Sequence, residues 1–400
     1  MTKKASTPAL RFKGFTYTWE QRKLSEFADK VTEKNVGLQY IETFTNSAEF
    51  GIISQRDFFD HDIAKMSSLG GYYIVRSEDF VYNPRISTSA PVGPINRNKL
   101  GRIGVMSPLY TVFRPHDIGT TYLEHFFKSK YWHSFMNFNG DSGARSDRFS
   151  IKDSVFFEMP IPIPHIEEQR KIGEYLTHLD RLITLHQRKY DKLTNMKKSM
   201  LEKMFPKNGA NVPEIRFKGF TDAWEQRKLG EAVQEVTRND ATSDAPIMMI
   251  TANNGFIEQS ERYAFNNAGE SLKKYILLEK GELAYNHGAS KLRPYGSCFT
   301  LTTSENARIP FVYHCFSADE QNSEFLSIEL NGADVENQLR RIVSSGARMD
   351  GLLNISFQEY VSVSVLLPTI EEQNKIADFF KNLDNPVSYT HLRAHETVLD

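Results

Sequence analysis

The sequence predicts an α+β protein made of two tandem, mixed, β-rich domains, each followed by a long helix. Three observations predict this fold class. Long blocks of sequence occur twice, in the same order, about 205 residues apart. The body of each half shows short apolar alternation interrupted by Gly, Pro and Asn, which is typical of strands joined by turns. A heptad pattern follows the first half and indicates a long helix with an apolar seam.

The repeated blocks define the domain organisation. They are RFKGFTYTWEQRKL at 11–24 with RFKGFTDAWEQRKL at 216–229, SGAR at 142–145 and 345–348, and PHIEEQRKIGEYLTHLD at 164–180 with PTIEEQNKIADFFKNLD at 368–384. A period this long exceeds that of solenoid repeats. It indicates a duplicated domain, each copy large enough to bury its own core. Residues 26–71 and 231–274 share little, so the inserts differ while the blocks that surround them recur.

The expected elements follow in the same order in each half. Strands are predicted at 80–87, 101–107 and 109–115, and in the second half at 281–286, 296–303 and 308–316. An amphipathic helix is predicted over 123–138. The segments 151–164 and 355–368 show period-2 apolar character and end in proline, so each is predicted to be a strand.

The first long helix is predicted over 166–205. Its apolar seam steps by four and three residues throughout, and only His186 and Lys197 interrupt it. The seam consists of Ile172, Leu176, Leu179, Ile183, His186, Tyr190, Leu193, Lys197, Met200 and Met204. Such a repeat predicts a coiled coil, and Pro206 with Asn208-Gly209 is expected to end the helix. The expected partner is the equivalent helix of the second half, packed antiparallel.

The second long helix is expected to be cut short. It follows the template of the first from Ile370 to Asn385, and Pro386 is then expected to end it because proline lacks an amide donor. Residues 386–400 follow no template, and VSYTHLRAHET resembles the translation of a transposon-end adaptor from sequencing-library preparation. We therefore expect these residues to be an artefactual tail on a truncated helix.

Composition excludes several classes of protein. The chain has 49 Lys+Arg and 50 Asp+Glu, so it cannot hold nucleic acid by overall charge, and any contact with phosphate must be local. Cys298 and Cys315 form no Cys-x-x-Cys pair, which argues against a structural zinc site. Without an apolar run of eighteen residues or a signal peptide, we expect no membrane partner and a cytoplasmic location.

Catalytic fingerprints are also missing from the sequence. It contains no Gly-x-x-x-x-Gly-Lys-Ser/Thr loop for ATP and no Asn/Asp-Pro-Pro-Tyr/Phe motif of an amino-methyltransferase. No recurring set of acidic residues and histidines has metal-ligand spacing. The sequence therefore predicts a chain that is not an enzyme and binds neither a cofactor nor a metal itself.

The repeated motifs carry a resemblance to a known family. Two domains with unlike inserts, each ending in a proline-terminated strand and an Ile-Glu-Glu-Gln helix start, resemble the specificity (S) subunit of type I restriction–modification systems. The SGAR blocks and the WEQRKL segments are similar to those of this family as well. The resemblance covers residues 8–385.

The resemblance implies a role in a DNA-modifying complex. Residues 1–165 and 207–369 would each be a target recognition domain that reads one half of a bipartite, asymmetric DNA site. Residues 166–206 would form the spacer helix, and residues 370–385 the start of its partner. Together the helices would dock two methyltransferase subunits, to which two restriction subunits can be added. S-adenosylmethionine, ATP and Mg²⁺ would belong to those partners.

Candidate residues for contact with DNA lie where shared blocks meet basic loops. Asn can bind adenine and Arg can bind guanine with paired hydrogen bonds. The candidates are Asn83, Arg85, Arg97, Lys99, Arg102 and Arg145 in the first half, and Asn286, Lys291, Arg293 and Arg348 in the second. Alternatively, Tyr-Asn at 82–83 and 285–286 is a strand-end turn with a packed Tyr, and each SGAR arginine pairs with a nearby Asp.

Candidate residues for partner binding lie on the heptad seam. They are Leu176, Leu179, Ile183, Tyr190, Leu193 and Met200. Two other functions stay open at this point: a duplicated β-domain module that is structural or binds protein, and an inactive, truncated specificity cassette. Strong salt dependence would separate DNA binding from protein binding.

Overall fold

The computed structural model describes residues 8–59, 64–141, 147–207, 209–252, 254–262, 269–343 and 352–396. The chain divides into two compact units, residues 1–185 and 186–400, and the boundary lies within one continuous helix. The SGAR blocks at 142–145 and 345–348 lie outside the described residues, so Arg145 and Arg348 are not placed.

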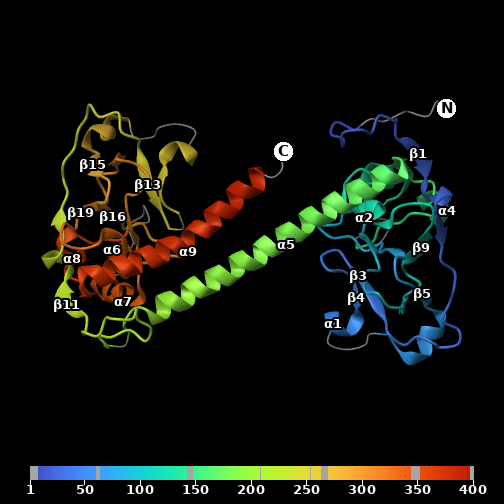
Figure 1. Ribbon diagram of the computed structural model, residues 1–400, viewed down its shortest axis with the longest axis horizontal. Coiled ribbons are helices and arrows are strands. Elements are labelled where there is room, and N and C mark those ends of the chain that lie inside the picture. The colour runs from blue at the N-terminus through green and yellow to red at the C-terminus, as the bar shows by residue number, and fades with distance from the viewer. Residues whose placement is uncertain are drawn as a thin grey trace. The chain divides into compact units, whose positions relative to one another are not determined.

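The first unit is built around a four-stranded antiparallel sheet with strand order β2-β9-β6-β7. Two further antiparallel pairs, β3 with β4 and β5 with β8, accompany this sheet (Figure 1). The strands are β2 Ala28–Lys30, β3 Phe44–Ser47, β4 Gly51–Ser54, β5 Tyr73–Val75, β6 Phe80–Tyr82, β7 Ile95–Arg97, β8 Gly104–Met106 and β9 Thr111–Pro115. The predicted β-rich body is confirmed.

The second unit repeats this arrangement strand for strand. Its four-stranded sheet has the order β12-β19-β16-β17, and the accompanying pairs are β13-β14 and β15-β18. The strands are β12 Gln234–Glu235, β13 Met248–Thr251, β14 Gly255–Glu258, β15 Ile276–Glu279, β16 Leu283–Asn286, β17 Ser297–Thr300, β18 Asn306–Ile309 and β19 His314–Ser317. The two inserts therefore have the same topology although they share little sequence.

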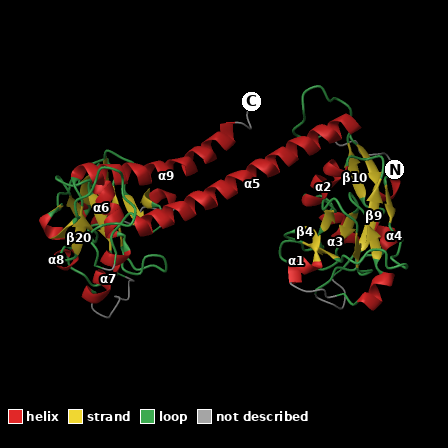
Figure 2. Ribbon diagram, turned by 60° about the horizontal axis from the view of Figure 1, so that its bottom comes forward, coloured by secondary structure: helices red, strands yellow, loops and turns green. Residues whose placement is uncertain are grey.

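Short helices cover the sheets of each unit (Figure 2). In the first unit they are η1 Leu24–Glu26, α1 Gln55–Phe59, η2 Met66–Gly71, α2 Thr120–Lys128, α3 His133–Asn139 and α4 Asp153–Phe156. In the second they are η3 Leu229–Glu231, η4 Gln259–Glu261, η5 Gly269–Lys274, α6 Ser323–Leu330, α7 Ala333–Ile342 and α8 Phe357–Tyr360.

The single helix expected over 123–138 is wrong, because α2 and α3 are separate helices. The Ser129 hydroxyl donates to the carbonyl of Phe126 at 2.6 Å and satisfies an end of α2. Trp132 is buried, and its indole donates to the carbonyl of Phe127 at 3.0 Å. Burial of this large side chain turns the backbone between the two helices.

The segments 151–164 and 355–368 are only partly strands. Each begins with a short helix, α4 or α8, and only its end forms a strand, β10 Pro160–Ile163 or β20 Ser364–Leu367. At Ser356 a capping box starts the helix: its hydroxyl accepts from the amide of Glu359 at 3.2 Å, and the Glu359 carboxylate accepts from the amide of Ser356 at 2.8 Å. This local hydrogen bonding overrides the strand-like alternation.

The repeated WEQRKL and proline-terminated segments pair with each other. In the first unit β1 Glu20–Lys23 lies antiparallel to β10, and in the second β11 Glu225–Lys228 lies antiparallel to β20. The first and last blocks of each repeat thus form one two-stranded sheet, from which the long helix starts. We call this sheet and the start of the long helix the frame of the unit. Buried aromatic residues, among them Phe80 and Phe113 stacked at 5.5 Å, fill the core of the first unit behind this frame.

The long helix α5 spans Ile166–Lys203, two residues short of the predicted end at 205. Its C-terminal end belongs to the second unit, where Met200, Met204 and Phe205 join a core with Phe325 and Phe380. Helix α9 spans Ile370–Glu396 and lies beside this end of α5 (Figure 1 and Figure 2). The expected end of the helix at Pro386 is therefore wrong, because a proline within a helix removes one donor and can kink the helix without ending it.

Helices α5 and α9 pair antiparallel within the second unit. Phe205 contacts Phe380 with ring centroids 6.2 Å apart, and eight residues earlier Lys197 binds the carboxylate of Asp384 at 2.6 Å. The residue numbers thus fall along one helix as they rise along the other. Among the described residues, no helix is long and apolar enough to cross a membrane, and no three His, Cys, Asp or Glu side chains are grouped for a metal ion.

Candidate functional site

The Glu of each Ile-Glu-Glu-Gln block anchors the opening segment of its repeat. Glu168 is buried and accepts two hydrogen bonds from the Arg11 guanidinium, both at 2.7 Å, and one from the Trp19 indole at 3.2 Å. In the second unit Glu372 accepts the same two bonds from Arg216, again at 2.7 Å. These carboxylates are fully committed to arginine, so the duplicated motif fixes the frame of each unit.

The Gln of each block joins the helix start to the body of its unit. The Gln169 side chain donates to the carbonyl of Pro164 at 2.8 Å and accepts from the amide of Gly119 at 2.8 Å. Gln373 makes the equivalent bonds to Pro368 at 2.9 Å and Asn322 at 3.0 Å. Each Gln therefore holds the strand end, the long helix and the start of α2 or α6 together. Any function that differs between the two units must lie elsewhere.

Asn83 is held by backbone groups of the first unit. Its amide nitrogen donates to the carbonyl of Asn46 at 2.8 Å, and its oxygen accepts from the amide of Arg85 at 3.0 Å. The preceding Tyr82 is buried and donates to the carbonyl of Val92 at 2.9 Å. The alternative interpretation of Tyr-Asn, a strand-end turn with a packed tyrosine, describes this geometry.

Asn286 is held in the same way in the second unit. Its nitrogen donates to the carbonyl of Ile250 at 3.0 Å, and its oxygen accepts from the amide of Gly288 at 2.9 Å. Tyr285 donates to the carbonyl of Tyr295 at 2.6 Å. The predicted readout of adenine by Asn83 and Asn286 conflicts with this geometry, since both groups that would bind the base already hold the turn.

Three predicted DNA-binding cations of the first unit are engaged in ion pairs. The guanidinium of Arg97 is only 11% exposed and contacts Glu78 at 2.9 Å and Glu124 at 2.5 Å. Lys99 binds Glu124 at 2.7 Å, and Arg102 makes a forked pair with Glu42 at 2.8–3.1 Å. The predicted free basic cluster is therefore a set of intramolecular ion pairs.

The carboxylate at the centre of this network is Glu124. Burial acts to raise its pKa, but the hydrogen bond from Lys99 and the charge of Arg97 outweigh burial, so the pKa of Glu124 lies below its ordinary value. The carboxylate of Glu124 is thus charged and neutralises Arg97 and Lys99, whose acidic partner the sequence alone does not indicate. Arg97 in particular is structural, because its release would leave a charged group without a partner in the interior.

The two predicted DNA-binding cations of the second unit that the structure describes, Lys291 and Arg293, differ in their surroundings. Arg293 donates to the carbonyl of Asn331 at 2.9 Å and is only partly exposed. Lys291 is exposed on the loop that follows β16. Among the described residues of this unit, Lys291 is therefore the predicted DNA-binding cation that remains accessible to a ligand.

Arg85 lies opposite Arg148, a residue that the sequence analysis did not single out. The two are partners in an antiparallel bridge, flanked by a hydrogen bond from the amide of Phe149 to the carbonyl of Pro84 at 2.7 Å. A second flanking bond runs from the amide of Ile86 to the carbonyl of Asp147 at 3.0 Å. Arg148 follows the SGAR block by three residues, and that proximity is the signal that could have indicated it.

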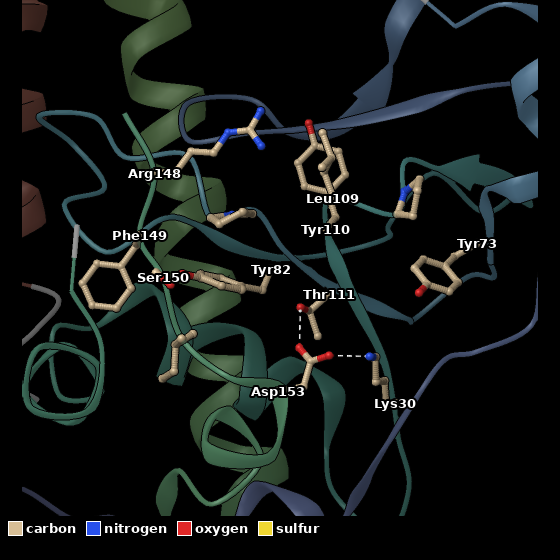
Figure 3. A pocket seen from close by; sticks show the side chains of 13 residues that line it. Lys30, Tyr73, Tyr82, Leu109, Tyr110, Thr111, Arg148, Phe149, Ser150 and Asp153 are labelled. Carbon is tan, nitrogen blue, oxygen red and sulfur yellow. Dashed lines mark hydrogen bonds and ion pairs between the residues drawn. The ribbon is translucent and has the colours of Figure 1, made fainter. Parts of the chain in front are cut away.

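A pocket of about 450 Å³ opens beside Arg148 (Figure 3). Tyr73, Tyr110 and Leu109 contribute apolar surface to its lining. Asp153 lies at one side, where it pairs with Lys30 and accepts from the Thr111 hydroxyl at 3.2 Å. Because Lys30 neutralises this carboxylate, Arg148 adds a net positive group to the lining of the pocket.

The predicted partner-binding residues on α5 differ in exposure. Ile183 is 67% exposed and Tyr190 is 46% exposed. Leu176, Leu179 and Leu193 are half-buried, whereas Met200 packs into the core of the second unit. Leu185, which the heptad pattern omits, is 50% exposed. The accessible apolar surface is therefore centred on the middle of the helix, and Met200 is occupied within the chain.

Comparison with known proteins identifies the first repeat. Residues 17–195 match the family described as the type I restriction modification DNA specificity domain. The fold is similar to that of the type I restriction–modification S subunit from M. genitalium, with TM-score 0.53 and 13% identity over 98% of this chain and 96% of that one. The HsdS subunit from Thermoanaerobacter tengcongensis matches with TM-score 0.42 and 15% identity over 98% and 93% of the two chains.

Proposed function

We propose that this chain is a specificity subunit of a type I restriction–modification system, because residues 17–195 match the family described as the type I restriction modification DNA specificity domain. In this proposal each of its two units reads one half of a bipartite, asymmetric DNA site. The observation that supports this most is the repeat of one frame around unlike inserts. The ion pairs of Arg11 with Glu168 and of Arg216 with Glu372 have the same lengths, while residues 26–71 and 231–274 share little sequence. Equal frames with unequal surfaces suit two different half-sites.

We further propose that the middle of α5 docks the methyltransferase subunits. Ile183 and Tyr190 lie seven residues apart, so they share one face of this helix. Both expose large apolar side chains, and such exposed apolar surface marks protein-binding sites. In this proposal two methyltransferase subunits and optionally two restriction subunits join the chain. S-adenosylmethionine, ATP and Mg²⁺ enter with those subunits, and this chain contributes recognition without catalysis.

The competing hypothesis is a duplicated module that binds protein. It shares the fold and the exposed helix, but it differs in its response to salt. Contact with DNA phosphates releases counterions, so binding of DNA weakens steeply as salt rises. Protein binding through apolar surface lacks this steep loss.

Selection from random-sequence double-stranded DNA by the complex of this chain with its methyltransferase subunits tests the proposal. We expect enrichment of two short specific sequences separated by a fixed gap, with an affinity that falls by orders of magnitude between about 50 and 200 mM salt. The methyltransferase subunits without this chain serve as the control. Recovery of no sequence preference, or of the same preference in the control, would overturn the proposal.

A further inference from the structure

We propose that Arg85 and Arg148 together bind one backbone phosphate of the DNA contacted by the first unit. This inference rests on the proposed function, and it deepens it by assigning a contact to two named side chains. The side chain of Arg148 has no role in the frame described above.

The backbone brings the two arginines to one face. The hydrogen bonds on either side of the bridge join Pro84 to Phe149 and Ile86 to Asp147, so Arg85 and Arg148 form a pair without hydrogen bonds between themselves. Residues opposed in this way have their Cβ atoms about 4.5–5.5 Å apart and project to the same side. Two guanidinium groups therefore start from neighbouring points on one surface.

The pair differs from most of the other arginines of the first unit, which have acidic partners. Within the part of the chain that the structure describes, neither Arg85 nor Arg148 has a salt bridge to a carboxylate. By contrast, carboxylates pair with Arg11, Arg22, Arg76, Arg97, Arg102 and Arg114. Like charges directly opposite in a sheet are destabilising, so this arrangement is favourable only when an anion joins it.

The chemistry of the pair suits a phosphate diester. A guanidinium presents several N–H donors in a planar fork that matches phosphate oxygens, and two such forks can share the oxygens of one group. Arg85 is exposed and Arg148 is partly exposed, so both can reach a ligand on the surface. Among the described residues the adjacent acid Asp147 forms no salt bridge with either arginine, and Asp153 in the neighbouring pocket is neutralised by Lys30.

The second unit lacks this pair although it has the same bridge. The equivalent antiparallel bridge joins Gly288 to Leu352, so neither position carries a charge. The bridge is thus part of the common frame, whereas the two arginines are a property of the first unit. A frame does not require the cations, and their presence in one unit alone indicates a ligand contact.

The test measures DNA affinity of the complex with methyltransferase subunits, using the duplex recovered by selection, as a function of salt. Arg85→Ala and Arg148→Ala are each expected to weaken binding about tenfold and to lower the slope of log K against log salt by about 0.9. The order of preferred sequences should not change, because phosphate contacts position the protein without reading bases. If both side chains hold one phosphate, the double variant should lose much less than the product of the two single effects.

Arg76→Ala is the matched control, because it removes one positive charge from a side chain that Glu33 already pairs at 2.9 Å. We expect its affinity to stay within about twofold of the parent. Thermal unfolding of each variant checks that the first unit is folded, and Arg85→Lys tests whether charge without the fork suffices. Parent-like affinity and slope for both alanine variants would overturn the inference and leave the proposed function standing. A parent complex without salt-sensitive DNA binding would overturn both.

Discussion

One buried ion pair recurs in both units and stabilises the same part of each. The carboxylates of Glu168 and Glu372 are each buried under an arginine from the opening segment of the same repeat. A carboxylate removed from water needs such a partner, and the partner here lies more than 150 residues away in sequence. The pair therefore ties the first block of each repeat to the last. Loss of the pair should therefore lower the stability of the whole unit.

We expect Glu168→Gln to destabilise the first unit by about 3 kcal/mol, because it leaves the guanidinium of Arg11 without its charged partner. The figure is at the low end of the usual range, since Arg11 keeps 13% of its side chain exposed. Urea unfolding of the chain measures the effect. The neighbouring Glu167→Gln is the control, because Glu167 is 57% exposed and pairs only with Arg170. Equal losses in the two variants would contradict the role of the buried pair.

Glu329 should make the second unit sensitive to pH. Burial raises the pKa of this carboxyl from 4.5 to about 7, outweighing its hydrogen bond from the amide of Leu366. Because the folded pKa is raised, the contribution of this carboxyl to stability is fully present below pH 4.5 and is lost as pH rises towards about 7. The difference amounts to about 3 kcal/mol.

Chemical unfolding at a series of pH values tests this expectation for Glu329. Glu329→Gln should remove most of the loss of stability between pH 4.5 and about 7, because the amide has no proton to release. Glu320→Gln, at an exposed position, serves as the control and should leave the profile unchanged. A profile that is the same in parent and Glu329→Gln would show that this carboxyl does not set the pH dependence.

At the scale of elements, the two ends of α5 pack in different units. Its first turns carry the buried Glu168 and Gln169 of the first unit. Met200 in its last turn and Met204, the residue that follows the helix, pack in the core of the second. The middle of the helix exposes Ile183 and Tyr190. A helix with two anchored ends and an exposed apolar middle suits a connector that binds partners between its anchors.

Truncation of Met204 should destabilise the second unit. The side chain is 3% exposed and packs in the core that contains Phe325 and Phe380. Met204→Ala is expected to cost about 2–5 kcal/mol through lost burial and a residual cavity. Met196→Ala on the same helix is the control, because Met196 is 39% exposed. Differential scanning calorimetry that shows equal shifts for the two variants would contradict the assigned packing.

Docking of the methyltransferase subunits should depend on the exposed middle of α5. Ile183→Asp places a charge on the apolar surface and is expected to weaken the complex at least tenfold while leaving the unfolding temperature of the chain unchanged. The measurement is sedimentation of the mixed subunits. His178→Asp adds the same charge at an exposed site on the opposite side of the helix, and it should have little effect. Comparable weakening by both variants would contradict a specific docking surface.

For the whole molecule, the sequence repeat and the structural repeat agree beyond the shared blocks. Pairs β3-β4 and β13-β14 occupy equal places although their sequences share little. Once the frame of a unit is fixed, differing side chains can be presented on the same strands, which is the arrangement that two half-sites require. The family match over residues 17–195 and the antiparallel contact of Lys197 with Asp384 fit this plan.

The frame of each unit could be predicted from the sequence, whereas most of the contacts of the candidate site could not, for physical reasons. The repeats and the heptads are local patterns, so α5 and most of the strands in the shared regions were predictable. Ion pairs are not local: Arg102 finds Glu42 across 60 positions, and no spacing rule indicates this partner. The same holds for Arg148, whose relation to Arg85 becomes visible only when the bridge between their two segments is known. Pairing and burial in three dimensions decide which cations stay available.

Methylation mapping of genomic DNA tests the central claim most directly. Cells that express this chain with the methyltransferase subunits of its system would be compared with cells that express the methyltransferase subunits alone. The account predicts methylation at a bipartite, asymmetric sequence with a fixed gap, found only when this chain is present. Methylation at one continuous sequence, or no methylated sequence although the assembled complex is recovered from the cells, would contradict recognition by two separate units.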